Sequence, residues 1–394
     1  MINIVDKTKC CGCQACVNIC HMNCITMETD DEGFQYPKVN ESICVSCGQC
    51  EKVCPFEREA SKRIKTPDSF AARIKDDGVR IQSSSGGIFT ALSNDILEEG
   101  GVVYGVAMSE NLKSAYHIRV DSVVGLELLR GSKYLQASTG DIYKQVRLDL
   151  KNGRKVLFSG VPCQINGLKF FLQKDYDNLL LVEVICHGVP SPALWKKYFE
   201  YLEKKFNASI EKVNFREKRN GWKVFGLTEH GKNISHYSNQ LEDPYMQMFL
   251  RDYCLRPSCY DCKVKKMESM ADLTIADFWG VQNIAPEMDD DKGTSLVLLQ
   301  SSKGIKAFES LKEICTSVRV SFDGSIKYNP AYFNSCKKPA ERDTFFLDMN
   351  SMEFDKLQAK YCKPIKPSFI KRVLRKAKAV IKKMFPFSKK PSKA

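Results

Sequence analysis

The chain has 394 residues, of which 43% are hydrophobic and 27% are charged, and its formal net charge is +13. These proportions are typical of a folded protein with two or three domains, and they exclude a disordered or collagen-like chain. The first ten residues include charged side chains and no apolar stretch, so we expect no secretory signal. No apolar run reaches the roughly 20 residues of a membrane-spanning helix. We therefore expect a cytoplasmic protein.

The positive charge is concentrated at the C-terminal end. Residues 363–394 contain twelve Lys or Arg and no Asp or Glu, so the rest of the chain is nearly neutral. The net positive charge of the chain therefore comes almost entirely from this tail. We expect no nucleic-acid partner for the folded part, because that part is nearly neutral.

Read at about 100° per residue, positions 369–385 place apolar side chains on one face of a helix and Lys and Arg on the other. This pattern predicts an amphipathic helix that makes peripheral contact with the inner face of the membrane. A helix docked on the body of the protein, with its charges in solvent, is the alternative.

Cysteine is the unusual residue, with eighteen in the chain and ten of them between Cys10 and Cys54. Thiols at regular short spacing in a cytoplasmic protein are more often metal ligands than disulfides. Two runs have the form Cys-x2-Cys-x2-Cys-x3-Cys: Cys10, Cys13, Cys16 and Cys20, then Cys44, Cys47, Cys50 and Cys54.

This doubled spacing resembles the bacterial two-cluster ferredoxins, in which the fourth cysteine of each run binds the other cluster. The resemblance implies two 4Fe–4S clusters, one on Cys10, Cys13, Cys16 and Cys54 and one on Cys20, Cys44, Cys47 and Cys50. Residues 25–27 and 34–36 read as the strands of a hairpin, which agrees with such a domain. A pair of structural zinc sites is the alternative.

The rest of the chain alternates strand and helix patterns. Residues 58–68 read as a linker, and they are followed by strands at 101–107, 156–158, 179–185 and 273–276 and helices at 88–97, 164–172 and 193–206. We therefore predict an α+β chain with a ferredoxin-like domain at 1–60, a mixed-sheet body in two parts at 61–150 and 151–335, and the tail at 363–394.

Two predicted strands of the body end in cysteine-bearing loops, at Cys163 and at Cys186. In α/β folds, ligands lie outside the carboxyl ends of the strands. Further along, Cys259 and Cys262 form a Cys-x2-Cys pair. These four thiols are enough for a third 4Fe–4S cluster, with Cys254 in reserve. A zinc clip or isolated buried thiols are the alternative.

Seven stretches of the chain together resemble the family of coenzyme F-420 hydrogenase/dehydrogenase beta subunits: residues 83–92, 131–134, 160–164, 186–192, 214–218, 259–262 and 277–280. The resemblance implies FAD beside a 4Fe–4S cluster, and electron transfer between a hydride-carrying deazaflavin, or another reducible partner, and iron–sulfur centres. The chain has no G-x-G-x-x-G motif and no P-loop, so NAD(P)H binding by a Rossmann fold is not expected.

The residues that we assign to FAD are Ser83, Ser84, Ser85, Gly86, Gly87, Lys133, Gly160 and Asp277. The serine and glycine run precedes a helical pattern, and the N-terminus of a helix attracts phosphate. An ordinary serine cap is the alternative for this run, a surface lysine for Lys133, and structural packing for Asp277. No catalytic residue stands out; Arg216, Lys218 and His187 remain candidates for a proton donor.

These features predict an iron–sulfur flavoprotein oxidoreductase. A flavin accepts two electrons as a hydride and releases them singly, whereas each cluster carries one electron. The partner is then a redox protein or a reducible small molecule. A ferredoxin-like electron-transfer adaptor without flavin is the alternative, and a zinc-stabilised interaction protein is a third interpretation.

Overall fold

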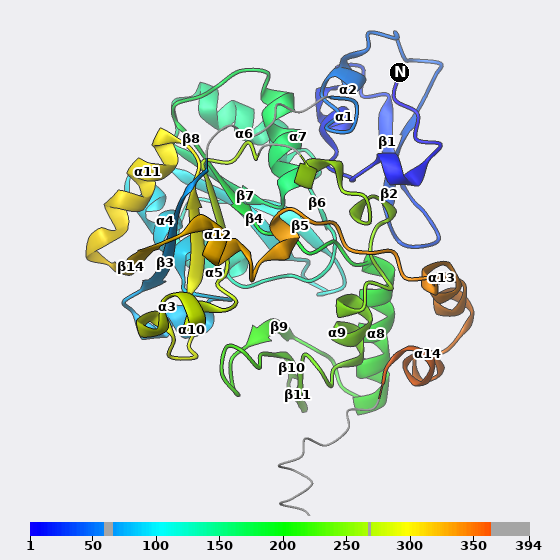
Figure 1. Cartoon of the computed structure of the whole chain (residues 1–394). Helices are drawn as coiled ribbons and strands as arrows, with labels where there is room; N and C mark the ends of the chain where they lie inside the picture. The colour runs from blue at the N-terminus through cyan, green and yellow to red at the C-terminus, as the bar shows by residue number, and fades with distance from the viewer. Residues whose placement is uncertain (59–65, 267–268, 364–394) are drawn as a thin grey trace, which may run out of the picture.

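The computed structural model describes residues 1–58, 66–266 and 269–363. A cysteine-rich N-terminal segment packs beside a larger body that is built on a nine-stranded sheet (Figure 1). Within the described ranges, no helix has both the length and the apolar character of a membrane span. The linker predicted at 58–68 lies mostly outside the described residues, and the amphipathic helix predicted at 369–385 lies wholly outside them.

The N-terminal segment contains the predicted hairpin, formed by β1 (Ile25–Thr29) and β2 (Gln35–Val39), which pair antiparallel. Each cysteine run continues into a short helix, α1 (Ala15–Ile19) or α2 (Gln49–Lys52). The residue before α2 is Gly48 at φ +71°, a left-handed conformation that glycine adopts without steric cost. The turn leaves the preceding thiols on a tight loop.

The body is centred on a mixed sheet of nine strands. Their order is β14 (Cys315–Val320), β3 (Asp68–Ile74), β13 (Ser295–Leu299), β12 (Leu273–Asp277), β8 (Leu179–Val184), β7 (Val156–Gly160), β4 (Val102–Met108), β5 (Ala115–Val120) and β6 (Ala137–Ser138). Both predicted parts of the body contribute strands to this one sheet. Strands β4, β7, β8 and β12 run parallel, so their carboxyl ends share one edge.

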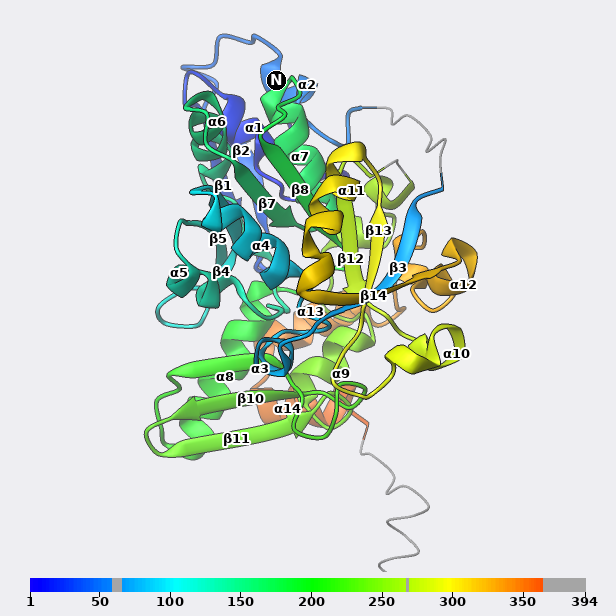
Figure 2. The ribbon, with the colours of Figure 1, turned by 90° about the vertical axis from the view of Figure 1, so that its left-hand side faces the viewer.

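Helices cover both faces of the sheet (Figure 2). One face packs on α4 (Ile88–Glu98), α5 (Val123–Leu129) and α11 (Ser302–Glu309), and the other packs on α6 (Ile142–Lys151) and α7 (Pro162–Leu172). The buried side chains of α6 and α7 share a hydrophobic core with the N-terminal cysteines. The N-terminal segment therefore lies against α6 and α7, the helices that come before and after β7 in the chain.

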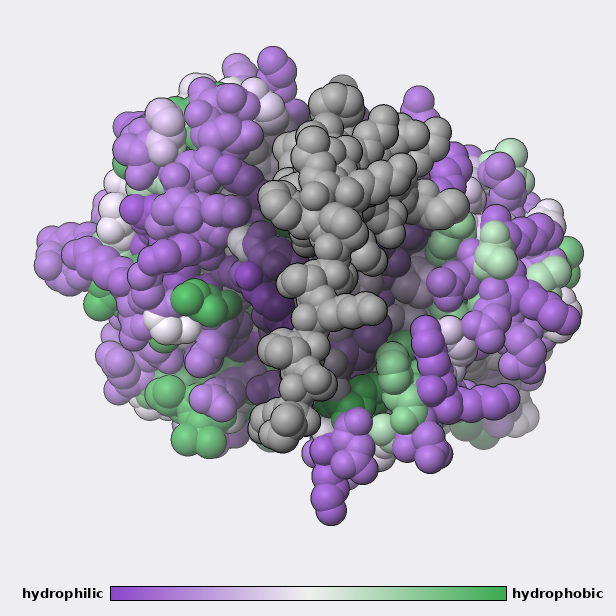
Figure 3. Space-filling model, turned by 90° about the horizontal axis from the view of Figure 1, so that it is seen from below, coloured by the Kyte–Doolittle hydropathy of each residue, from purple (hydrophilic) through white to green (hydrophobic). Residues whose placement is uncertain are grey.

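A second layer lies below the sheet in Figure 1. It contains α8 (Pro192–Phe206), α9 (Pro244–Leu250), α13 (Arg342–Ser351), α14 (Phe354–Tyr361) and a three-stranded antiparallel sheet of β9 (Lys212–Glu217), β10 (Gly226–Gly231) and β11 (Ile234–Asn239). The sequence predicts α8 and none of the others. Seen from below, this face is mainly hydrophilic, and its hydrophobic residues lie in small separate groups (Figure 3).

The mixed α/β body that the sequence predicts is confirmed. The predicted strands at 101–107, 156–158, 179–185 and 273–276 are β4, β7, β8 and β12, and the predicted helices at 88–97, 164–172 and 193–206 are α4, α7 and α8. Strands β7 and β8 are central and buried, so their sequences are continuous apolar runs.

Candidate functional site

The first cysteine run closes around a cavity of about 310 Å³, its open mouth included. Four of the lining residues are the cysteines that the ferredoxin resemblance assigns to the first cluster: Cys10, Cys13, Cys16 and Cys54. Gly12, at φ +70°, lies where a Cβ atom would approach Arg256 Nη1 to 2.9 Å. The loop can therefore turn here only because this residue has no side chain.

Burial is the main cause that raises the pKa of Cys10, Cys16 and Cys54, whereas for Cys13 the main cause is its contact with Cys11. Burial raises the pKa of Cys54 to about 12 and raises the pKa of Cys16 further. Metal binding would therefore release their protons, because thiolates are the ligating form. Four convergent sulfur donors, of which those of Cys13, Cys16 and Cys54 are buried, match the ligand set of a 4Fe–4S cluster.

The second predicted set consists of Cys20, Cys44, Cys47 and Cys50. In this set Cys50 is buried and Cys47 is exposed. Cys24, which the sequence analysis does not assign, lies beside the set, with its Sγ 3.4 Å from that of Cys20. This contact with Cys20 is the main cause that raises the pKa of Cys24 to about 12.

A second cavity, of about 430 Å³ with its opening included, lies in the body. Its lining includes all four cysteines that the sequence assigns to a third cluster: Cys163, Cys186, Cys259 and Cys262. Two of them meet because β7 and β8 are parallel neighbours, with Gly160 opposite Glu183. Cys186 lies in the loop after β8, whereas Cys163, predicted in a loop, lies in the first turn of α7, which begins directly after β7. The other two come from a segment almost 100 residues further along the chain.

Cys254, the reserve ligand, is fully buried in a different hydrophobic cluster and does not line this cavity. Burial raises its pKa to about 12. Cys11 was not assigned from the sequence, yet it lines both cavities. Its thiol contacts those of Cys13 and Cys163. A surplus cysteine of the first run therefore connects the two cavities.

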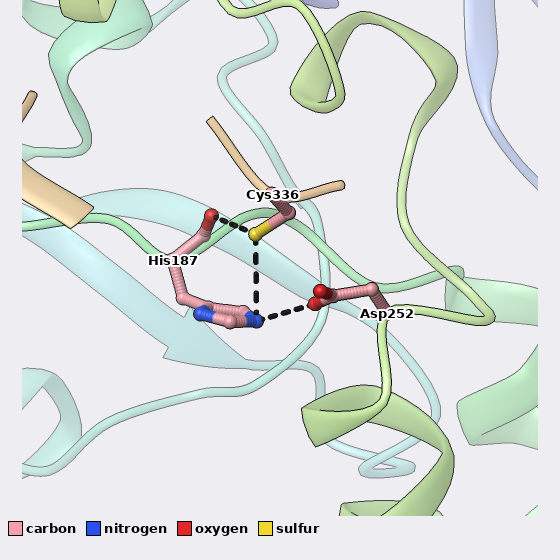
Figure 4. Close-up of side chains that lie close together, drawn as sticks. All are labelled: His187, Asp252 and Cys336. Atoms are coloured by element: carbon pink, nitrogen blue, oxygen red, sulfur yellow. Dashed lines mark hydrogen bonds and ion pairs between the residues drawn. The ribbon is translucent and has the colours of Figure 1, made fainter. Parts of the chain in front are cut away.

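His187 lines the body cavity, and its ring makes two polar contacts (Figure 4). Its Nε2 is 2.6 Å from Asp252 Oδ1 and 3.5 Å from Cys336 Sγ. The ligand atoms of these three residues lie within 4.8 Å of one another. Asp252 adopts φ +63°, a left-handed conformation that costs free energy in a residue with a Cβ atom.

The serine and glycine run that we assign to FAD precedes α4, as predicted. Ser85 Oγ donates to Thr294 O, and Ser84 Oγ is 2.9 Å from Ser132 Oγ. Ser83 Oγ donates to Val79 O, so protein groups engage all three hydroxyls. Helix α4 begins after Gly87 at φ +85° without a side-chain cap, and Gly86 N–H donates to Ser295 Oγ.

Lys133 caps the end of a helix in the structure. Its Nζ donates at 3.0 Å to the carbonyls of Leu128, Leu129 and Arg130, at the end of α5. Burial lowers its pKa to about 7. Lys218 is held similarly, with three carbonyl acceptors at 2.8 Å.

Asp277, at the carboxyl end of β12, accepts hydrogen bonds from Arg216 Nη2 at 2.8 Å and from Trp222 Nε1 at 2.9 Å. The Arg216 side chain is 2% exposed and also donates to Ser84 O, so the β9–β11 sheet is joined to the serine run. In the described part of the chain its Nε has no hydrogen-bond partner. A buried guanidinium with a free donor, next to an uncapped helix N-terminus, suits an anionic group such as a pyrophosphate. Gly160 lies apart from this group, at the end of β7 near Cys163.

Three family profiles match successive segments of the chain. Residues 9–57 match the 4Fe-4S dicluster domain. Residues 69–142 match the N-terminal domain of the coenzyme F420 hydrogenase/dehydrogenase beta subunit, and residues 153–317 match its C-terminal domain. The chain belongs to the family of coenzyme F420 hydrogenase/dehydrogenase beta subunits. The family and the N-terminal cluster domain predicted from the sequence are thereby confirmed.

The chain spans less than two thirds of the length of the curated relatives that it matches. The chain is 27% identical over 167 residues to the coenzyme F420-dependent sulfite reductase of Methanocaldococcus jannaschii, a match that covers 42% of this chain and 26% of the relative. It is 20% identical over 229 residues to a component of the F(420)H(2) dehydrogenase of Methanosarcina mazei, a match that covers 54% of this chain and 61% of that component. A chain of the F420-reducing [NiFe] hydrogenase complex from Methanosarcina barkeri is 15% identical with a TM-score of 0.45, over 76% of this chain and 94% of that one.

Proposed function

We propose that this protein is an iron–sulfur flavoprotein oxidoreductase that passes electrons between a two-electron partner and a one-electron partner. The observation that carries the proposal is the body cavity, where cysteines from three separate segments converge beside the cavity of the ferredoxin-like domain. Cys11 lines both cavities, which gives two adjacent redox centres a direct contact.

The proposed ligands are those assigned from the sequence. The ferredoxin-like domain holds one cluster on Cys10, Cys13, Cys16 and Cys54 and another on Cys20, Cys44, Cys47 and Cys50, and the body holds a third on Cys163, Cys186, Cys259 and Cys262. The support is that the first and third sets each surround one cavity. Three thiols of the first set are buried, and the other thiols of the two sets are partly buried, which limits the access of water to a cluster.

FAD is the proposed two-electron centre. When bound, a flavin accepts a hydride and releases its electrons one at a time. The chain would hold its pyrophosphate at the N-terminus of α4, with the amides that follow Gly86 and the free donor of Arg216. Asp277 fixes the Arg216 guanidinium in place at 2.8 Å. The alternative is a ferredoxin-like adaptor, which would hold the same three clusters but no flavin and would therefore not accept a hydride.

A deazaflavin coenzyme is the proposed two-electron partner, because two relatives carry F420 in their names. The one-electron partner is then a redox protein that meets the ferredoxin-like domain. Anaerobic mixing with a reduced deazaflavin or with NADH distinguishes the donors. We expect only the deazaflavin to bleach the cluster absorption, since the chain has no dinucleotide-binding fingerprint.

Anaerobic purification tests the proposal as a whole. We expect about twelve iron atoms and as many sulfides per chain, since each of three clusters contains four, together with one FAD. Clusters without flavin would support the adaptor. Stoichiometric zinc without iron or sulfide would contradict every form of the proposal.

A further inference from the structure

Arg256 is fully buried between the ferredoxin-like domain and the body. It belongs to the body, two residues after Cys254, yet its Nε donates to Cys10 O at 2.7 Å and its Nη2 to Gln35 O at 2.9 Å. Its Nη1 donates to Gln136 Oε1 at 3.0 Å. These acceptors are neutral, so they satisfy its donors without balancing its charge.

None of the described carboxylates lies within 4.0 Å of this guanidinium. Other buried arginines differ: Arg342 pairs with Glu32, and Arg80 pairs with Asp290. A buried charge without a partner costs several kcal/mol, so an anion is expected beside Arg256.

The acidic groups that surround Arg256 are thiols and one phenol. Its Nη2 lies 3.5 Å from Cys10 Sγ, and the thiols of Cys11 and Cys259 are close enough to interact with its charge. The guanidinium also stacks 4.2 Å from the ring centroid of Tyr36, whose pKa burial raises, so this phenol stays neutral. Only ionised thiols can supply the missing negative charge, and iron binding ionises thiols.

We propose that Arg256 is the buried counter-charge of the cluster held by Cys10, and that it raises the reduction potential of this cluster above that of the second ferredoxin cluster. The inference rests on the proposed function, since it requires the clusters. Reduction adds one negative charge to a cluster, and a fixed cation nearby stabilises the reduced form.

The second predicted set lacks a comparable cation among the described residues. The charged group near Cys44 and Cys50 is the amine of Met1, which is exposed and already paired with Glu51 at 2.8 Å. Solvent and this carboxylate weaken its field. Because Arg256 comes from the body, docking of the body would make the adjacent cluster the preferred site for an electron.

A redox titration followed by electron paramagnetic resonance tests the inference on the anaerobically purified full chain. In Arg256→Gln we expect the reduced-to-oxidised ratio of the cluster held by Cys10 to fall about tenfold at a fixed potential. This change corresponds to a reduction potential that is lower by about 59 mV for one electron. The second ferredoxin cluster, on Cys20, Cys44, Cys47 and Cys50, should titrate as in the wild type. Arg256→Lys, which keeps the charge, should restore most of the ratio.

Arg80→Gln is the matched control, because it also removes a buried arginine but lies in α3 (Asp77–Gln82) and lines neither cavity. All clusters should titrate normally in this variant. An unchanged titration of Arg256→Gln with full iron content would overturn the inference. If Arg256→Gln lost iron, restoration by lysine would support a counter-charge, and loss in both variants would overturn it. A wild-type protein without clusters would refute the proposed function instead.

Discussion

Arg342 in α13 donates both terminal guanidinium nitrogens to the carboxylate of Glu32, at 2.7 and 2.5 Å, although the two residues lie 310 positions apart. Glu32 belongs to the turn of the ferredoxin hairpin, and the Arg342 side chain is only 4% exposed. A two-point pair of this kind fixes orientation as well as distance. It joins the C-terminal helices to the N-terminal cysteine segment.

Substitution Glu32→Gln should loosen the docking of the ferredoxin-like domain. It leaves the buried Arg342 with only the exposed Asp343, whose Oδ1 is 3.5 Å from Nη1, as a carboxylate partner, and breaking a buried pair costs about 3–5 kcal/mol. Hydrogen exchange of the β1–β2 hairpin should increase markedly. Lys38→Gln is the control, since its pair with Glu28 is exposed on both sides and contributes about 0–1 kcal/mol. Equal exchange in the two variants would contradict the docking role of Glu32.

Cys259→Ala should remove the body cluster and leave the ferredoxin clusters in place. We expect a loss of about four iron atoms per chain, because one thiolate ligand is missing from a four-iron cluster. Chemical iron analysis and electron paramagnetic resonance measure the loss. Cys254→Ala, five residues away and outside the cavity, should retain all the iron. If Cys254→Ala lost iron and Cys259→Ala did not, Cys254 would replace Cys259 as the ligand.

Arg216→Gln should lower the flavin content of the purified protein. A hydrogen bond to a charged group contributes about 1.5–3 kcal/mol, so its loss corresponds to at least a tenfold weaker affinity for FAD. Flavin released by denaturation and measured by fluorescence gives the ratio per chain. Arg219→Gln removes a half-exposed arginine that lies just after β9, the strand that contains Arg216, and should keep the flavin. Full flavin content in Arg216→Gln would exclude this arginine from the FAD site.

Deletion of residues 364–394 tests the membrane contact predicted for the basic tail. We expect co-sedimentation with anionic liposomes to be lost, because each basic residue near the surface contributes about 1 kcal/mol to binding. Neutral liposomes provide the control, and raised salt should weaken the binding of the full chain. Identical sedimentation of the two proteins would favour a tail docked on the body.

The sequence locates the cysteine-rich loops of the N-terminal domain because their signal is local. The spacing of Cys10, Cys13 and Cys16 is determined by one turn of the chain, so it is visible in a few letters. The third set is predicted from a rule of topology, since Cys163 and Cys186 each follow a buried strand and parallel strands end at one edge. The long apolar runs of β7 and β8 likewise reveal their burial.

The roles of Cys11, Arg256 and the pair of Glu32 with Arg342 depend on contacts between distant segments. Nothing local distinguishes Cys11 from any other small buried residue, or Arg256 from a surface arginine. Their positions follow from the packing of the N-terminal segment against α7 and the loop before Cys259. The sequence alone thus determined which thiols are available at short spacing, because neighbouring residues share one backbone turn. Only the tertiary structure decided that Arg256 is buried with no carboxylate from the described residues beside it and that Cys11 lines both cavities, because both features arise from the packing of segments that are distant in the sequence.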